Sequence, residues 1–142
     1  MKNLNLVGLF TVGLITFSTF STQALQTNPQ IRICNQFEGE FLVAQNGDDQ
    51  VGLCKLDSAI IGSLDLLSLS DAISSNYAQS IQIYEADIRS CEPYGQIITI
   101  QLLQSYPLDV CFFNDGSMIE INTLKSGIHS TKNIKLNKVL GF

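Results

Sequence analysis

Apolar residues occupy every second position along four stretches of the chain, which fall into two pairs. The four stretches are 41–43, 51–53, 98–100 and 108–110. Alternation with a period of two is typical of a half-buried β-strand. Turn-forming residues separate the members of each pair, at 46–49 and at 105–107. A further hairpin signal, Asn114-Asp115-Gly116, precedes an alternating stretch at 119–122. The pattern therefore predicts two antiparallel meanders.

Two segments predict helices. Asn28 followed by Pro29 is the pattern of an N-cap with proline at the first helical position. The second segment carries apolar residues at steps of three and four, which predicts one apolar helix face that packs in the core. These residues are Ile73, Tyr77, Ile81, Tyr84, Ile88 and Cys91. Ser70 or Asp71 is the expected cap of this helix, with a break near Ser80 as an alternative.

The four cysteines, Cys34, Cys54, Cys91 and Cys111, indicate an internal duplication. Each pair encloses nineteen residues, and the two pairs start 57 residues apart. An aromatic residue lies three positions after each first cysteine, and the strands at 41–43 and 98–100 match in position and parity. We therefore expect an α+β fold of two tandem modules, each an initial helix followed by a three-stranded antiparallel β-meander held by a disulfide.

The N-terminus predicts export. Lys2 precedes an uncharged apolar run over 4–20, and Thr22-Gln23-Ala24 places small residues where a signal peptidase cleaves. A membrane anchor is the alternative, which glycine and hydroxyl residues in the run disfavour. The expected organisation is 1–24 signal peptide, 25–69 module 1, 70–125 linking helix and module 2, and 126–142 basic C-terminal tail. The mature protein would be periplasmic or secreted.

The cysteines have two chemical interpretations, disulfides or a zinc site. Structural zinc sites bring their cysteines as closely spaced pairs, whereas nineteen residues lie within each pair here. Export also favours oxidation. Four cysteines allow three pairings. The duplication favours pairing within each copy, Cys34 with Cys54 and Cys91 with Cys111. Paired cysteines are unavailable as nucleophiles, and no metal or other cofactor is predicted.

Charge is distributed unevenly. Residues 25–124 carry thirteen acidic side chains against three basic ones, a net charge of −10, and this excludes nucleic acid as a partner. Residues 125–142 carry no acid and four lysines, Lys125, Lys132, Lys135 and Lys138. One interpretation is that this tail contacts anionic lipid. We favour the other, in which the tail lies on the acidic body of the same molecule.

The chain resembles a small exported bacterial family, the domain of unknown function 333, whose members are often labelled haemolysins. The resemblance rests on NPQIRIC at 28–34, GEF at 39–41, GLCKLD at 52–57 and CFFNDGSMIE at 111–120. The second copy has the aspartate-glycine turn of the family, where the first copy has Asp57-Ser58-Ala59. The haemolysin label implies a membrane-active protein, but fold transfers through such a resemblance better than activity.

Catalytic groups are sparse in the sequence. His129 is the one histidine, and a general base needs an oriented partner and a nucleophile. Ser117, Ser126 and Ser130 are the serines considered, and none lies in a nucleophile-elbow motif. Asp48 and Asp49 follow Gly47 in a turn that lacks the ligand ladder of a calcium loop. We expect a non-enzyme.

Three function classes follow, in order of preference. The first is an exported, disulfide-stabilised binding module for an unknown protein or cell-envelope ligand, with an inhibitor-like role as one form of it. The second is a membrane-active haemolysin, and the third is a small hydrolase that uses His129. The second copy retains the family turn, so the candidate binding residues are Asn114, Asp115, Gly116, Ser117 and Glu120.

Overall fold

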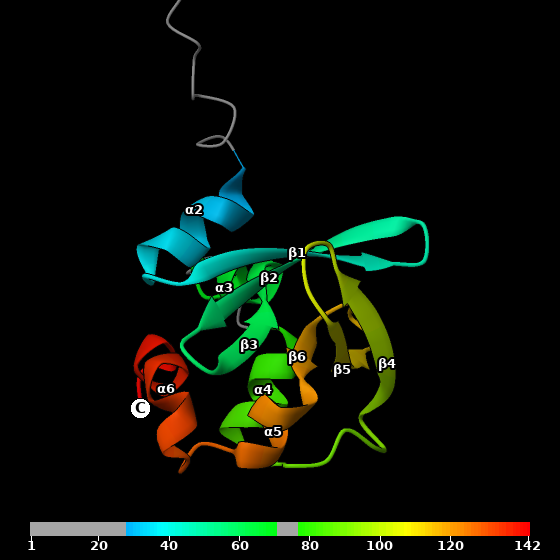
Figure 1. Ribbon diagram of the computed structural model, residues 1–142. Helices are drawn as coiled ribbons and strands as arrows, with labels where there is room; N and C mark the ends of the chain where they lie inside the picture. Colours follow the sequence, from blue (N-terminus) through cyan, green and yellow to red (C-terminus); the bar gives the residue numbers. More distant parts are fainter. Residues whose placement is uncertain (1–27, 71–76) are drawn as a thin grey trace, which may run out of the picture.

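Six antiparallel strands close into one barrel, in the order β1-β2-β3-β6-β5-β4 (Figure 1). The computed structural model describes residues 28–70 and 77–142, so the predicted signal peptide and Ile73 lie outside the described residues. The strands are β1 Glu40–Asn46, β2 Asp49–Leu56, β3 Ala59–Gly62, β4 Gly95–Leu102, β5 Pro107–Phe113 and β6 Met118–Glu120. The helices are α2 Pro29–Gln36, α3 Ser63–Ser68, α4 Gln79–Glu85, α5 Ile121–Ser126 and α6 Ile134–Leu140, with a 3₁₀ turn η1 at Thr131–Asn133.

The prediction of two separate meander modules is wrong. The two meanders are joined into one barrel by pairing of β3 with β6, at Ile61 and Ile119, and of β1 with β4, at Ala44 with Leu102 and Gln45 with Gln101. Each third strand also runs straight into a short helix, β3 into α3 and β6 into α5, and neither helix was predicted. A three-stranded sheet leaves two edges unpaired, and joining the sheets covers part of each edge.

Apolar side chains gather in two clusters, one inside the barrel and one between the barrel and the helices. All six strands contribute to the first, whose buried members are Ala44, Leu53, Ile60, Ile100, Leu102, Leu108, Val110 and Met118. The second combines strand residues with residues of the helices, Leu66, Ile81, Tyr84, Leu124 and Leu136 among them. The helices therefore cover one side of the barrel and bury the outward-facing apolar residues of its strands (Figure 1).

Helices α2 and α4 end in the same way. Asn28 caps α2 as predicted, since its side chain accepts the N–H of Gln30. After each helix one acidic residue, Glu38 or Asp87, takes a left-handed conformation, and the next N–H reaches back to the last turn. The continuous helix predicted up to Cys91 is therefore wrong. Its described part, α4, ends at Glu85, because the turn at Asp87 redirects the chain towards the barrel.

The equal cysteine intervals conceal a shift of one residue. Phe41 pairs with Cys54, and the residue that pairs with Cys111 is Ile97, not Ile98. Phe41 lies seven positions after Cys34, whereas Ile97 lies six after Cys91. The hairpin of β4 and β5 is longer by one residue than that of β1 and β2, so the interval between the cysteines is the same in both copies. A one-residue shift reverses the face that each side chain occupies. Phe41 accordingly packs beneath the helices, while Ile98 packs in the barrel, so the predicted match in parity is wrong.

Candidate binding site

The two disulfides join Cys34 to Cys54 and Cys91 to Cys111, which confirms the predicted pairing. Each disulfide lies against a glycine that begins or precedes a strand. A Cβ atom on Gly39 would meet Cys54 Sγ at 2.6 Å, and one on Gly95 would meet Cys111 Sγ at 2.8 Å. No cysteine of the described chain remains free. The sulfur atoms are structural, and the disulfides are typical of a protein that matures in an oxidising compartment.

The predicted binding turn lies between β5 and β6, where it supports α4. Asn114, Asp115 and Gly116 are exposed, and Ser117 is buried. Asp115 accepts the N–H of Gln79 at 2.7 Å and that of Ser117 at 2.9 Å. Burial favours the neutral acid, but these hydrogen bonds outweigh it and hold the pKa of Asp115 below its ordinary value. In its described contacts, Asp115 thus stabilises the first turn of α4.

A buried carboxylate that the sequence analysis missed lies beside this turn. Asp65 is 4% exposed, and its Oδ2 accepts the Ser80 hydroxyl at 2.6 Å and the Met118 N–H at 2.9 Å. Burial raises the pKa of Asp65 from 3.8 to about 7. A lone acid within the apolar run Leu64-Asp65-Leu66-Leu67 was the available signal, because such a residue on a buried helix needs hydrogen-bond partners.

Glu120, the last of the predicted binding residues, lies away from the turn at the start of α5. Its side chain caps this helix, accepting hydrogen bonds from the Thr123 hydroxyl at 2.6 Å and from the Asn122 amide at 2.9 Å. It also lines a polar cavity of about 590 Å³ between α5, η1 and the β2–β3 turn. The structure thus separates Glu120 from the exposed turn residues.

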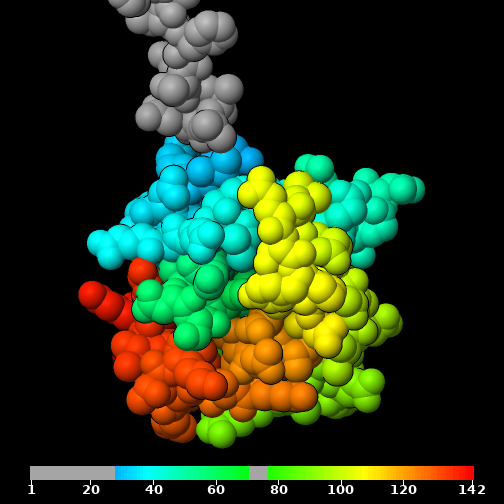
Figure 2. Space-filling view, in the orientation of Figure 1, coloured from blue at the N-terminus to red at the C-terminus, as the bar shows by residue number. Residues whose placement is uncertain are grey.

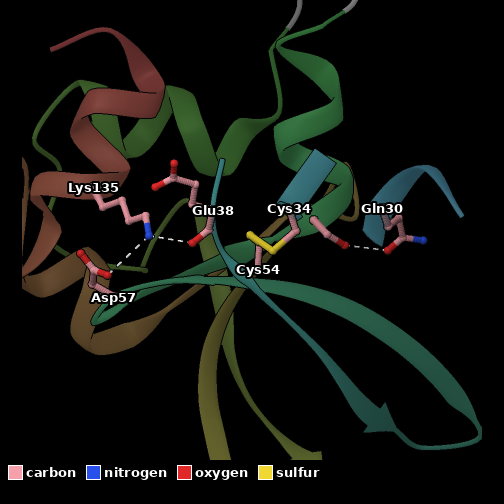
Figure 3. The surroundings of a disulfide bond; sticks show 7 residues. Gln30, Cys34, Glu38, Cys54, Asp57 and Lys135 are labelled. Carbon is pink, nitrogen blue, oxygen red and sulfur yellow. Dashed lines mark hydrogen bonds and ion pairs between the residues drawn. A yellow bond between two sulfur atoms is a disulfide. The ribbon is translucent and has the colours of Figure 1, made fainter. Parts of the chain in front are cut away.

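The C-terminal lysines do not form one surface. Lys135 lies over the first half of the chain, where its ammonium group donates to the Glu38 carbonyl at 2.6 Å and lies 3.6 Å from an Asp57 carboxylate oxygen (Figure 3). Lys125 and Lys132 line the polar cavity, and Lys138 is exposed. Leu136 is fully buried, so α6 packs its apolar face in the core. Across 28–70 and 77–142, no helix is long and apolar enough to span a membrane.

His129 lies in the segment between α5 and η1 and is exposed. Its side chain takes part in no hydrogen bond within the part of the chain that the structure describes. The nearby serine Ser130 instead caps η1, where its hydroxyl accepts the Lys132 N–H at 3.2 Å. The two side chains therefore do not form a nucleophile and base pair in this arrangement.

An open groove lies between β1 and the turn that joins β4 to β5. We call it the β1 groove; it has a volume of about 470 Å³ and is lined by residues 40–43, 55 and 102–106. Leu103 and Tyr106 stand on its rim and are 53% and 57% exposed. Glu40 and Lys55 form an ion pair of 3.6 Å at its end. In Figure 2 the yellow β4–β5 turn stands on the surface beside the cyan β1 segment.

The edge of β1 is only partly paired along this groove. A two-residue turn joins β1 to β2, so the backbone groups of residues 40, 42, 44 and 46 face β2, and those of Phe41 and Val43 face the other side. The Val43 carbonyl accepts the Leu103 N–H at 3.1 Å. Pairing between β1 and β4 is limited to two residue pairs, both beyond Val43. The peptide groups of Phe41 and the Val43 N–H are therefore directed into the groove.

Comparison with known proteins identified no family model, curated protein or solved structure that matches this chain.

Proposed function

We propose that this chain is an exported binding protein that accepts an extended, basic polypeptide segment in the β1 groove. The observation that supports it most is the unpaired part of the β1 edge, where the N–H and carbonyl of Phe41 and the N–H of Val43 face the groove. An extended segment satisfies such an edge by adding a strand, and its alternate side chains then enter the neighbouring pockets.

The side chains around the edge suit this mode of binding. Leu103 and Tyr106 offer apolar surface at the rim of the groove. Tyrosine on a rigid scaffold gives a large contact area at a low cost in conformational entropy. The Cys34–Cys54 disulfide holds α2 against β2, and β2 pairs with β1 along the whole of β1, which limits the movement of the strand to which the segment adds.

The charge of the protein indicates the charge of the segment. Residues 25–124 carry a net charge of −10, and the tail offsets only part of it. Within the groove, Lys55 pairs with the carboxylate of Glu40, so the preference for a basic segment rests on the net charge of the whole protein. Because complementary charge guides association, a segment with lysine or arginine residues is favoured over an acidic one.

The membrane-active alternative receives less support from the described residues. It needs a free amphipathic surface, whereas Leu136 is fully buried, and Val139 and Leu140 pack against the same core. The chain would have to release α6 before those residues could enter lipid. The proposal assigns the protein no catalytic step.

Selection of short linear peptides from a random library on the oxidised protein tests the proposal. We expect enrichment of sequences with apolar residues at alternate positions and with lysine or arginine between them, and weaker binding at high salt. The variant Val43→Pro removes one N–H from the free edge but leaves the β1–β2 ladder intact, since that group faces away from β2. It should abolish binding.

A second variant, Leu103→Ser with Tyr106→Ser, should weaken binding of the selected peptides by at least about tenfold. Ile134→Ser is the matched control, because Ile134 is an exposed apolar residue on α6, outside the groove. Equal binding by the groove variants and the wild type, or a selection without enrichment, would contradict the proposal.

A further inference from the structure

The polar cavity beside α5 differs in kind from the β1 groove. Its wall combines the end of β6, the length of α5, η1 and Ser58 of the β2–β3 turn, and all of its lining residues are polar or charged. A volume of about 590 Å³ lies within the range of small-molecule sites. In Figure 2 the green, orange and red segments that contribute to this wall meet on the face shown. A wall without apolar side chains favours a ligand rich in hydrogen-bonding groups.

Glu120 forms the fixed negative group of this cavity. It is 7% exposed, and three donors hold its carboxylate: the hydroxyl and N–H of Thr123 and the amide of Asn122. The Oε1 atom accepts only one of these hydrogen bonds, from Asn122, so it retains capacity for a donor on a ligand. A carboxylate held in this way is positioned before a ligand binds.

The first half of the chain has no counterpart of this carboxylate. The corresponding position at the end of β3 is Gly62, and α3 begins there without a side-chain cap. In both halves, the third strand is held by a side chain from the short helix of the other half: α5 holds β3, and α3 holds β6. Thr123 accepts the Ile60 N–H at 3.0 Å, as Asp65 accepts the Met118 N–H. Glu120 is thus an addition of the second half of the chain.

Two ammonium groups accompany Glu120. Lys125 on α5 and Lys132 on η1 are exposed at the cavity, and among the described ion pairs neither has a partner. A simple anion would meet the lysines and be repelled by Glu120, whereas a neutral sugar would leave both lysines unused. A ligand with an acidic group at one end and hydroxyl groups at the other satisfies both.

We infer that this cavity is a second binding site, which takes an acidic sugar. The acidic group lies at Lys125 and Lys132, and a sugar hydroxyl donates to Glu120. Asn122 and Ser126 supply further donors and acceptors at the wall. The acidic sugar is either a free monosaccharide or the end of an acidic oligosaccharide, since the two share this chemistry.

Titration of the oxidised ¹⁵N-labelled protein with glucuronic acid tests the inference by NMR. We expect amide shifts over 120–133 that leave the β1 groove unchanged, and affinities for glucose, acetate and inorganic phosphate weaker by at least about tenfold. An oligosaccharide ending in glucuronic acid that binds more tightly than the monosaccharide would support the site and assign it to a chain end.

The variant Lys125→Gln with Lys132→Gln should weaken glucuronic acid binding by at least about tenfold, the effect of removing charge-assisted hydrogen bonds. Lys138→Gln, another exposed lysine but outside the cavity, is the matched control and should bind as the wild type does. These side chains make no described hydrogen bond or ion pair within the fold, so the double variant should keep the wild-type fold, with amide shifts confined to the neighbourhood of the substituted residues. Acetate or phosphate binding as tightly as glucuronic acid, or unchanged binding by the double variant, would overturn the inference.

Discussion

Asp65 on α3 accepts the backbone N–H of Met118 on β6 at 2.9 Å, although 53 positions separate the two residues. The contact is reciprocated in the other half of the chain, where Thr123 on α5 accepts the N–H of Ile60 on β3. Each half therefore supplies a polar side chain that stabilises the last strand of the other. The pair at Asp65 differs in that its acceptor is a titratable group.

The stability of the protein should depend on pH through Asp65. Its pKa is raised from 3.8 to about 7, so between these values the folded state keeps a proton that the unfolded state has lost. The contribution of Asp65 to the free energy of unfolding should therefore be highest below pH 4. It should fall as pH rises to about 7, by roughly 4 kcal/mol in total.

Urea unfolding at intervals from pH 4 to pH 8 measures this dependence. Asp65→Asn keeps an oxygen that accepts from Met118 and Ser80 but does not titrate, so its stability should vary less with pH over this range. Comparison of the two proteins cancels the contribution of the other carboxylates. The same pH dependence in both would show that Asp65 does not hold a proton in the folded state.

Gly39→Ala should destabilise the protein by about 1–3 kcal/mol, the usual cost of overpacking. The added methyl group would approach Cys54 Sγ to 2.6 Å and Cys34 Sγ to 2.9 Å. The cost should shrink when both cysteines are replaced by alanine, because the sulfur atoms are then absent. A double-mutant cycle by urea unfolding measures the coupling. Additive effects would mean that the glycine is needed for another reason.

Removal of the Cys34–Cys54 disulfide, by Cys34→Ala with Cys54→Ala, should itself lower the free energy of unfolding by about 3 kcal/mol. The loop that it closes separates the cysteines by 20 positions, as does the loop of Cys91 and Cys111. The corresponding alanine pair at Cys91 and Cys111 should therefore cost a similar amount, measured by urea unfolding. A negligible loss in either variant would contradict the loop-closure account.

Lys135→Gln should lower the free energy of unfolding by about 1 kcal/mol. Its ammonium group donates to the Glu38 carbonyl of the turn after α2, and so links the C-terminal helix to the first half of the chain (Figure 3). Lys138→Gln is the control with the same change of charge, and its effect should be close to zero. Equal effects in urea unfolding would show that Lys135 acts only through net charge.

Leu136→Ala should destabilise the protein by about 2–5 kcal/mol, because Leu136 is fully buried in the cluster beneath the helices. Ile134→Ala, at a residue 62% exposed on the same helix, should cost less than about 0.5 kcal/mol. Thermal or urea unfolding distinguishes the two. If both variants are neutral, α6 is detached in solution, and the membrane-active alternative gains support.

Local features of this protein were predictable from the sequence. The N-cap at Asn28, the paired strands of both hairpins and the two disulfides follow from patterns of adjacent or regularly spaced residues. These features depend on backbone conformation and chain proximity over short stretches, which residue type largely determines. The candidate turn at 114–117 was found for the same reason, as a turn.

Tertiary structure decided the rest, because it depends on which elements meet. The pairing of β3 with β6 turned two expected meanders into one barrel, and the left-handed turn at Asp87 ended a helix whose apolar stripe continues to Cys91. The equal cysteine intervals did not reveal that Ile98 faces the interior of the barrel and Phe41 faces the helices. In the second copy, the segment between the first cysteine and the strand is shorter by one residue and the hairpin is longer by one, so the interval is unchanged. The β1 groove, the Asp65 contact and the cavity at Glu120 all join residues from distant parts of the chain, so packing alone creates them.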